Sequence, residues 1–338
     1  MAEEKALNVG PSRLEIAYER FGDPALPPML LIMGGGAQMI NWPDGFCTEL
    51  VERGLHVIRF DSRDTGHSSH LSDAPTVDLP AALAGDLTTA SYHLSDMAAD
   101  TVGLLGALGF DSAHLVGLSM GGMIAQTIAI EHPDRIRSLT SISSRTGAPG
   151  VGDADFAAIG PLGPQPHDRQ SYLDWQVRAS RAIWSPGYAF DEAAVAETAG
   201  RVYDRGRDHE AMMRHFVAVL ASGDRTAPLK SLRIPTLVLH GANDLMCDVS
   251  GARATADAIP GAKLMIFDGM GHHLPRELWP TFADHIAELS AHPSRDGPEP
   301  RPGRLPIEPV GGCELSALAW RSASRLAAGR DRGVRPAE

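Results

Sequence analysis

The amino-acid sequence predicts an α/β fold: a doubly wound, mostly parallel sheet with an inserted helical lid. First, short apolar runs alternate with stretches of helical periodicity, as strands and helices do in such folds. Second, most of these runs are continuously apolar, which is typical of strands covered on both faces. Third, residues 147–227 show helical patterns but no convincing strand. We therefore expect a core of residues 1–146 and 228–293, and a lid of residues 147–227.

The predicted strands are short and mostly apolar. Leu14, Ile16 and Tyr18 alternate with polar residues, as in a strand with one buried face. The later strands are continuous apolar runs, which comprise residues 29–33, 56–60, 114–116, 139–142, 236–239 and 263–267. A parallel sheet requires strands of this kind when helices cover both of its faces.

Helical patterns lie between the strands, in residues 46–53, 94–108, 120–132 and 250–258. In residues 94–108 apolar side chains recur about every 3.6 positions, and Ser95 is the expected N-cap. Within the predicted lid, helical patterns occupy residues 172–184, 191–206 and 209–221. Four aromatic residues of the lid either line an apolar pocket or pack its helices together, namely Trp175, Trp184, Tyr188 and Phe216.

Composition and charge narrow the classes of function. The 338 residues are 43% hydrophobic and 21% charged, which is ordinary for a globular protein that buries a large core. The net charge of −12 argues against nucleic acid binding. No run approaches the roughly 20 apolar residues of a membrane helix. The N-terminus also lacks the pattern of a signal peptide.

The three cysteines, Cys47, Cys247 and Cys313, are far apart in the chain. They form neither a disulfide framework nor a pair with metal-ligand spacing. The glycine-rich segment 33–36 lacks the rest of a nucleotide-binding fingerprint. We therefore expect a cytoplasmic protein that uses no metal and no cofactor.

Residues 294–338 differ in composition from the rest of the chain. They contain eight arginines and six acidic residues, and five prolines fall between residues 295 and 309. Prolines at this density exclude a helix and predict an extended linker. Residues 315–326 have the apolar spacing of one short helix. We expect a disordered tail, with binding of a partner as the alternative.

The sharpest local motif is Gly117-Leu118-Ser119-Met120-Gly121, which lies between an apolar run and a helical pattern. Gly-x-Ser-x-Gly at a strand-to-helix junction is typical of a nucleophile elbow. The turn lifts the serine hydroxyl out of the sheet, and the glycines leave room where two backbones pass closely. Unpaired N–H groups at the helix N-terminus favour negative charge there. Ser119 is therefore the predicted nucleophile.

A serine needs a base to take its proton, and histidine suits that role near neutral pH. His272 follows the last predicted strand in a glycine-rich loop that can bring an imidazole over the sheet edge. The neighbouring His273 is its rival. We predict that His272 is the base.

The imidazole needs an acid that orients it and stabilises its charged form. Asp244 directly follows a predicted strand and is the expected acid, with Asp248 and Asp268 as alternatives. The order Ser119, Asp244, His272 is the one expected of serine triads in hydrolases built on α/β sheets. Each residue falls just after a strand, where open α/β sheets place their sites.

A tetrahedral oxyanion needs fixed hydrogen-bond donors. One predicted donor is the backbone N–H of Met120, directly after the nucleophile. The other is the N–H of Gly35, in the glycine-rich turn after an early strand. A polar cluster nearby is expected to hold the loop beside this turn through contacts among its own members, which are Asp61, Arg63 and Ser68.

Taken in order, these motifs resemble the α/β-hydrolase superfamily of serine esterases over residues 1–293. The first third of the chain is similar to the aclacinomycin methylesterases of anthracycline biosynthesis, in Met33-Gly34-Gly35, Asn41-Trp42-Pro43, residues 56–61 and Arg63-Asp64-Thr65-Gly66. Those enzymes remove a methyl group from a polyketide carboxylate ester. The resemblance implies the α/β-hydrolase fold, the triad Ser119, Asp244 and His272, and the Gly35 and Met120 donors.

The sequence therefore predicts a cofactor-free serine hydrolase that acts on a small-molecule carboxylic ester. The resemblance favours a polyketide-type methyl ester. A dehalogenase or an epoxide hydrolase would carry aspartate in place of Ser119. A perhydrolase or a lyase of the same fold uses the same three side chains and stays an alternative. A ligand-binding protein that has kept the fold is the other alternative.

Overall fold

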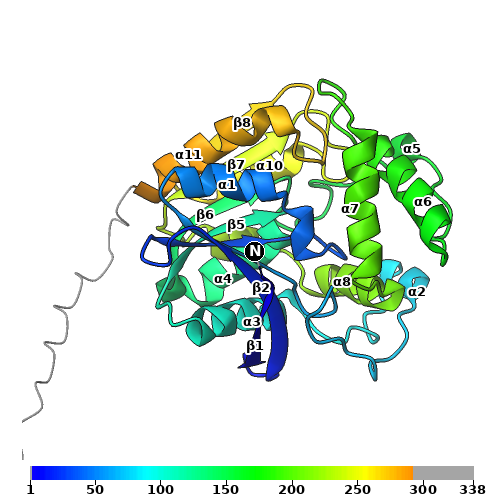
Figure 1. The fold of residues 1–338 in the computed structure, drawn as a ribbon, viewed down its shortest axis with the longest axis horizontal. Helices are drawn as coiled ribbons and strands as arrows, with labels where there is room; N and C mark the ends of the chain where they lie inside the picture. Colours follow the sequence, from blue (N-terminus) through cyan, green and yellow to red (C-terminus); the bar gives the residue numbers. More distant parts are fainter. Residues whose placement is uncertain (1, 292–338) are drawn as a thin grey trace, which may run out of the picture. The chain divides into compact units, whose positions relative to one another are not determined.

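The computed structural model describes residues 2–291, which contain one eight-stranded sheet (Figure 1). Its strand order is β1-β2-β4-β3-β5-β6-β7-β8. The pairs β1–β2 and β2–β4 are antiparallel, and all later pairs are parallel. The strands are β1 Glu4–Val9, β2 Leu14–Phe21, β3 Pro28–Ile32, β4 His56–Phe60, β5 Ala113–Leu118, β6 Ile136–Ile142, β7 Thr236–Gly241 and β8 Lys263–Phe267. The predicted doubly wound, mostly parallel α/β fold is confirmed.

Helices cover both faces of the sheet. α3 and α4 pack together on one face, and α1 and α11 pack together on the other (Figure 1). In β3, Leu30 belongs to the apolar cluster of the first layer, and Leu31 belongs to that of the second. Both faces are buried, which explains why the strands read as continuous apolar runs. The helices of the core are α1 Asp44–Glu52, α3 Leu94–Ala107, α4 Met120–Glu131, α10 Ser250–Ala258 and α11 Trp279–Ala291.

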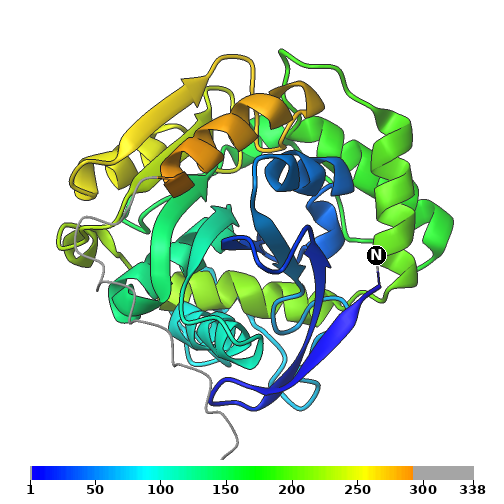
Figure 2. The same cartoon turned by 60° about the vertical axis from the view of Figure 1, so that its left-hand side comes forward.

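The residues between β6 and β7 are helical and contain no strand. α6 packs on α7, and both lie at the right of Figure 1 and of Figure 2. α8 contacts the short helix α2. The bounds are α2 Leu79–Leu83, α5 Phe156–Ile159, α6 Arg169–Ala182, α7 Glu192–Asp204, α8 His209–Ala221 and α9 Thr226–Leu229. We refer to residues 147–227 as the insertion.

The two ends of the insertion meet at its base. The Arg225 N–H donates to the Thr146 carbonyl at 2.9 Å, and the Thr226 hydroxyl donates to that of Thr146 at 2.9 Å. A Cβ on Gly147, whose φ is +90°, would lie 2.4 Å from the Gly223 carbonyl oxygen. The chain therefore leaves the core and returns to it at one point.

The prediction lacks β1, α2, α5, α9 and α11, as well as three short 3-10 helices. β1 is an edge strand with only two buried positions, so it has no apolar run to reveal it. No helix within residues 2–291 is both long and apolar enough to cross a bilayer. The predicted tail and its short helix at 315–326 lie outside the described residues.

The prediction that Ser95 caps α3 is wrong. His93 occupies the N-cap position, and its backbone N–H donates to Asp96 Oδ2 at 2.8 Å. Ser95 lies inside the first turn, where its hydroxyl donates to Glu131 at 2.6 Å. The carboxylate of Asp96 therefore replaces the serine as the group that satisfies the start of the helix.

Candidate active site

Ser119 occupies the turn between β5 and α4. Its φ of 56° and ψ of −120° are strained for a residue that carries a side chain. A Cβ on Gly117 would lie 2.2 Å from the Gly121 carbonyl oxygen, and a Cβ on Gly121 would lie 2.0 Å from that of Ile32. Only glycine fits at these two positions, so the close approach of the backbones accounts for the Gly-x-Ser-x-Gly spacing.

His272 and Asp244 form a hydrogen-bonded pair. His272 Nδ1 lies 2.8 Å from Asp244 Oδ2 and 3.0 Å from Oδ1. The Asp244 carboxylate is buried, and it also accepts the N–H groups of Met246 and Cys247 at 2.9 Å each. Burial alone would raise the pKa of Asp244, but His272, His240 and the Cys247 N–H outweigh it and lower the pKa. A charged Asp244 holds the proton on Nδ1, which leaves Nε2 free to accept one.

The alternatives for the base and the acid lie in other environments. The His273 ring packs on Trp184 with ring centroids 5.2 Å apart, and burial lowers the pKa of His273 to about 4. The Asp248 carboxylate accepts the N–H groups of Ser250 and Asp153. Asp268 is exposed and is not hydrogen-bonded to His272.

The three predicted residues follow the carboxyl ends of strands in one sheet. Ser119 follows β5, Asp244 follows β7 and His272 follows β8. Among the described residues, no hydrogen bond joins Ser119 Oγ to His272. The structure thus brings Asp244 and His272 together and leaves the contact with the serine open. In a free enzyme such contacts are often long and tighten when substrate binds.

The glycine-rich turn after β3 lies against the nucleophile. A Cβ on Gly34 would lie 3.2 Å from Ser119 Cβ, and a Cβ on Gly35 would lie 3.6 Å from Met120 Sδ. The Ala37 N–H donates to the Gly34 carbonyl at 3.2 Å. In the described part of the chain, the N–H groups of Gly35 and Met120 donate to no protein acceptor. Both predicted oxyanion donors are therefore available to a ligand.

One side chain that sequence reasoning missed touches this turn. His215, on α8, accepts the Gly36 N–H at Nδ1, with the two nitrogens 3.0 Å apart. The chain has 14 histidines, and a histidine at a helical position carries no signal of its tertiary partner. Sequence alone had no means of separating His215 from the others.

The predicted cluster beside the turn is only partly confirmed. Asp61 Oδ1 accepts the Met39 N–H at 2.7 Å, and the Ser68 hydroxyl donates to the Asp61 carbonyl at 2.6 Å. Arg63, however, does not pair with Asp61. It forms a buried two-contact ion pair with Asp100, at 2.6 and 2.9 Å. Arg205, at the end of α7, is the cation that pairs with Asp61.

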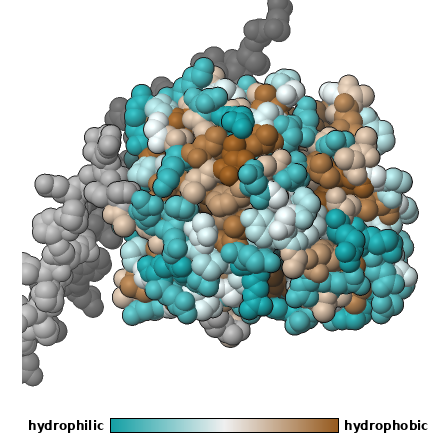
Figure 3. All heavy atoms as spheres, turned by 90° about the horizontal axis from the view of Figure 1, so that it is seen from above, coloured by the Kyte–Doolittle hydropathy of each residue, from teal (hydrophilic) through white to brown (hydrophobic). Residues whose placement is uncertain are grey.

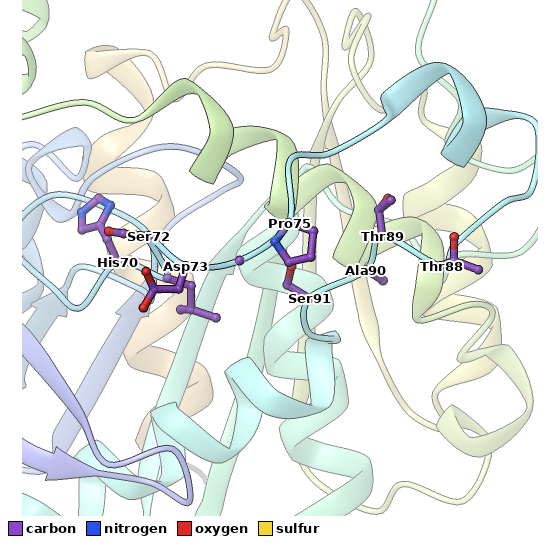
Figure 4. A pocket seen from close by; sticks show the side chains of 10 residues that line it. His70, Ser72, Asp73, Pro75, Thr88, Thr89, Ala90 and Ser91 are labelled. Carbon is purple, nitrogen blue, oxygen red and sulfur yellow. The ribbon is translucent and has the colours of Figure 1, made fainter.

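Two hollows bear on where a ligand could bind. One, of about 620 Å³, is lined by residues 70–75 and 88–91, and it contains none of the predicted site residues (Figure 4). The other, of about 490 Å³, is lined by residues from 181–190 and 242–245, including Asp244. Of the predicted site residues, only Asp244 lines the second hollow, and neither Ser119 nor His272 lines either one.

The four aromatic residues of the insertion that the sequence singled out lie in different environments. Trp184 lines the second hollow, where its ring meets that of Phe190 edge-on at 5.0 Å. Trp175 donates to the Leu162 carbonyl at 3.0 Å, and Tyr188 packs against the core. Phe216 is 38% exposed. Seen from above, hydrophobic patches alternate with hydrophilic residues over the surface (Figure 3).

Within residues 2–291, no three His, Cys, Asp or Glu side chains lie together as a metal site would require. Cys47 and Cys247 are both buried, and burial raises the pKa of each thiol. These thiols therefore stay protonated near neutral pH.

Known proteins share this architecture. Residues 27–275 match the family model described as the alpha/beta hydrolase fold. The chain is 30% identical to rhodomycin D methylesterase DnrP of Streptomyces peucetius, over 76% of this chain and 88% of that protein. It is 28% identical to rhodomycin D methylesterase DauP of Streptomyces sp. strain C5, with the same coverage.

A solved hydrolase from Pseudomonas aeruginosa PA01 superposes with a TM-score of 0.65 at 24% identity, over 86% of this chain and 99% of that one. This likeness supports the fold. The family model covers most of the chain, including β3 to β8 and the loop that carries His272. The chain therefore belongs to the alpha/beta hydrolase family.

Proposed function

We propose that this protein is a serine esterase in which Ser119, His272 and Asp244 form the catalytic triad. The two methylesterase relatives and the family match support hydrolysis of a carboxylic ester. The observation that carries the assignment of residues is the Asp244–His272 hydrogen bond at the same sheet edge as the strained Ser119 turn. Fold alone would not suffice, because unrelated activities share it.

In the proposed reaction, Ser119 Oγ attacks the ester carbonyl while His272 Nε2 takes its proton. The N–H groups of Gly35 and Met120 bind the resulting oxyanion. His272 then protonates the departing alcohol, which leaves an acyl-enzyme. Water activated by His272 attacks the acyl-enzyme and releases the acid. Asp244 stays charged and holds the imidazole in one tautomer throughout.

For the substrate, we propose a methyl ester of a polyketide-type carboxylic acid. The support is the name of the two relatives, rhodomycin D methylesterase, together with the similarity in the first third of the chain. We further propose that the insertion acts as a lid that shapes the substrate pocket. The support for this role is that α8 of the insertion reaches the turn beside Ser119, where His215 Nδ1 accepts the Gly36 N–H and Met212 lies against Gly36.

The test measures hydrolysis of two kinds of substrate. One is a series of p-nitrophenyl esters from acetate to octanoate, and the other is an aromatic polyketide methyl ester, whose hydrolysis is monitored as the methanol released. Wild type and Ser119→Ala are compared side by side. Turnover by the wild type that is lost in Ser119→Ala supports the proposal. Turnover that survives in Ser119→Ala refutes Ser119 as the nucleophile.

Two further outcomes distinguish the alternatives. Folded wild type that turns over no ester, yet binds the polyketide ester, indicates a ligand-binding protein. Faster reaction with hydrogen peroxide than with water, measured as peracid formed, indicates a perhydrolase. Calorimetry with the ester and a peracid assay on the same preparation separate these outcomes.

A further inference from the structure

His215 joins the oxyanion turn to the helical insertion. Its side chain is buried on α8, between the turn after β3 and the loop after β4. Nδ1 lies 3.0 Å from the Gly36 nitrogen, and Nε2 lies 2.9 Å from the Arg63 carbonyl oxygen. The imidazole therefore bridges two core loops from a helix that belongs to neither.

The two partners fix the state of the imidazole. The Gly36 N–H can only donate, so Nδ1 must accept, and the Arg63 carbonyl can only accept, so Nε2 must carry the hydrogen. Protonation would place a second hydrogen against the Gly36 N–H. Burial lowers the pKa of His215, and the Arg214 and Arg63 guanidiniums lower it further. The Arg63 carbonyl and the Asp64 carboxylate oppose that shift without reversing it. The ring is thus neutral in a single tautomer near neutral pH.

The backbone at Gly36 leaves α8 in direct contact with the turn. Gly36 has a φ of +69°, and a Cβ there would lie 2.4 Å from Met212 Cγ. One residue earlier, a Cβ on Gly35 would lie 3.6 Å from Met120 Sδ and 3.9 Å from His215 Cβ. Gly35 therefore lies between the residue that follows the nucleophile and the histidine of α8.

We propose that His215 is a positioning residue, which holds the oxyanion turn through the Gly36 N–H so that the Gly35 N–H faces the carbonyl attacked by Ser119. This inference rests on the proposed esterase function. The hydrogen bond from the Gly36 N–H to His215 keeps that N–H from competing with the Gly35 N–H for the oxyanion. It also fixes the orientation of the peptide that joins Gly35 to Gly36. The free Gly35 N–H is then held in place before substrate arrives, which is what stabilisation of an oxyanion requires.

The surroundings keep the imidazole in place. The adjacent Arg214 forms a buried two-contact ion pair with Asp64, at 2.9 and 3.0 Å. The Tyr92 hydroxyl donates to Asp64 at 2.8 Å, and the Tyr92 ring meets the His215 ring edge-on at 6.1 Å. These contacts anchor α8 on the core, so a shift of His215 relative to the turn would break a buried ion pair.

Two near-isosteric substitutions separate the two hydrogen bonds. His215→Asn keeps an acceptor near the position of Nδ1 and loses the donor to Arg63. His215→Gln keeps a donor near the position of Nε2 and loses the acceptor for Gly36. His114→Gln is the matched control, because His114 is also buried and bonded through Nδ1, to Ser138 at 2.8 Å, at the far end of β5.

We expect His215→Gln to lower kcat about 10- to 100-fold with KM within about threefold, since full removal of an oxyanion donor costs roughly 10²–10³-fold. His215→Asn should stay within about threefold of wild type. A boronic acid that mimics the tetrahedral intermediate should lose affinity for His215→Gln in proportion to kcat/KM. Amide hydrogen exchange in residues 33–38 should speed up in His215→Gln and not in His215→Asn.

A merely structural role predicts a different pattern. In that case His215→Gln, His215→Asn and His114→Gln all lower Tm while kcat per folded molecule stays constant, which would overturn the inference. Full activity in His215→Gln beside an active wild type refutes the positioning role alone. Absence of Ser119-dependent turnover in the wild type refutes the esterase function, and this inference with it.

Discussion

The Asp244 carboxylate binds both its own loop and His272. Oδ1 accepts two backbone N–H groups of its own loop, and both oxygens reach His272 Nδ1. In Asp244→Asn the amide preserves the size of the side chain but cannot stabilise a charged imidazole. We expect kcat to fall about 10³- to 10⁴-fold, with the fold retained, as measured by steady-state ester hydrolysis and circular dichroism.

Asp248→Asn is the control for that experiment, because Asp248 binds backbone N–H groups and does not touch His272. Its activity should stay within about twofold of wild type. Equal losses in the two variants would contradict the assignment of Asp244 as the acid.

The glycines of the nucleophile turn allow a sharper test of backbone packing. A Cβ at Gly121 would lie 2.0 Å from a backbone oxygen, whereas at Gly106, inside α3, the nearest atom is 4.0 Å away at the end of a flexible arginine. Gly121→Ala should prevent stable folding. Gly106→Ala should raise the unfolding free energy by about 0.5–1 kcal/mol. Urea denaturation measures both, and similar stability of the two variants would contradict this account of the turn.

At the scale of elements, α8 is fixed to the core by a buried ion pair. Burial alone would raise the pKa of Asp64, but Arg214, the Leu71 N–H and the Tyr92 hydroxyl outweigh it and lower the pKa. Asp64→Asn leaves the buried Arg214 with only Asp208 as a counter-charge, which is partly exposed and 3.5 Å away. We expect a loss of about 3–5 kcal/mol in the free energy of unfolding at pH 7. Asp64→Asn combined with Arg214→Met should lose less, because no unpaired charge remains.

The same pair predicts a pH dependence. The pKa of Asp64 is lower in the folded state than in the unfolded state. The contribution of Asp64 to the free energy of unfolding is therefore complete above the unfolded-state pKa of about 3.9, and it is lost as the pH falls through the folded-state pKa. The difference in stability between wild type and Asp64→Asn should therefore shrink below about pH 4. Urea denaturation from pH 3 to 7 measures it, and a constant difference would exclude the ion pair as its cause.

Periodicity predicted the buried elements well and the exposed ones poorly. β4, α8 and α10 begin and end at the predicted residues, because burial on one or both faces imposes a pattern on their sequences. β8 does so as well, although its positions are only partly buried, because its run is almost entirely apolar. β1 lies at the edge of the sheet with few buried positions, so it has no such pattern. Side-chain pairing was harder still: Arg63 binds Asp100, which lies far along the chain and within reach only after folding.

The residues of the candidate site also divide into those that the sequence predicted and one that it missed. Ser119, Asp244 and His272 follow strand ends, and strand ends can be found in the sequence. The free Gly35 and Met120 N–H groups follow from local backbone turns, which glycine spacing also reveals. His215 reaches the turn from 179 residues further along the chain, and only the packing of α8 brings the two together.

At the scale of the whole molecule, the sheet, both helical layers and the proposed catalytic residues all lie before residue 292. A chain ending at residue 293 should therefore keep the Tm and the kcat of the full-length protein. Differential scanning fluorimetry, ester hydrolysis and size-exclusion chromatography compare the two forms. A lower Tm or an altered assembly would assign residues 294–338 a role in stability or in partner binding.

The meeting of the insertion's ends at Thr146 and Arg225 bears on how such enzymes diversify. A segment that leaves the core and returns to it at one point can be replaced by another segment without a change in the order of the strands. In this protein, however, the exchanged segment carries His215 and Arg214, which contact the turn and the loop of the core. Evolution of a new specificity through this segment must therefore preserve, or reinvent, a support for the oxyanion turn.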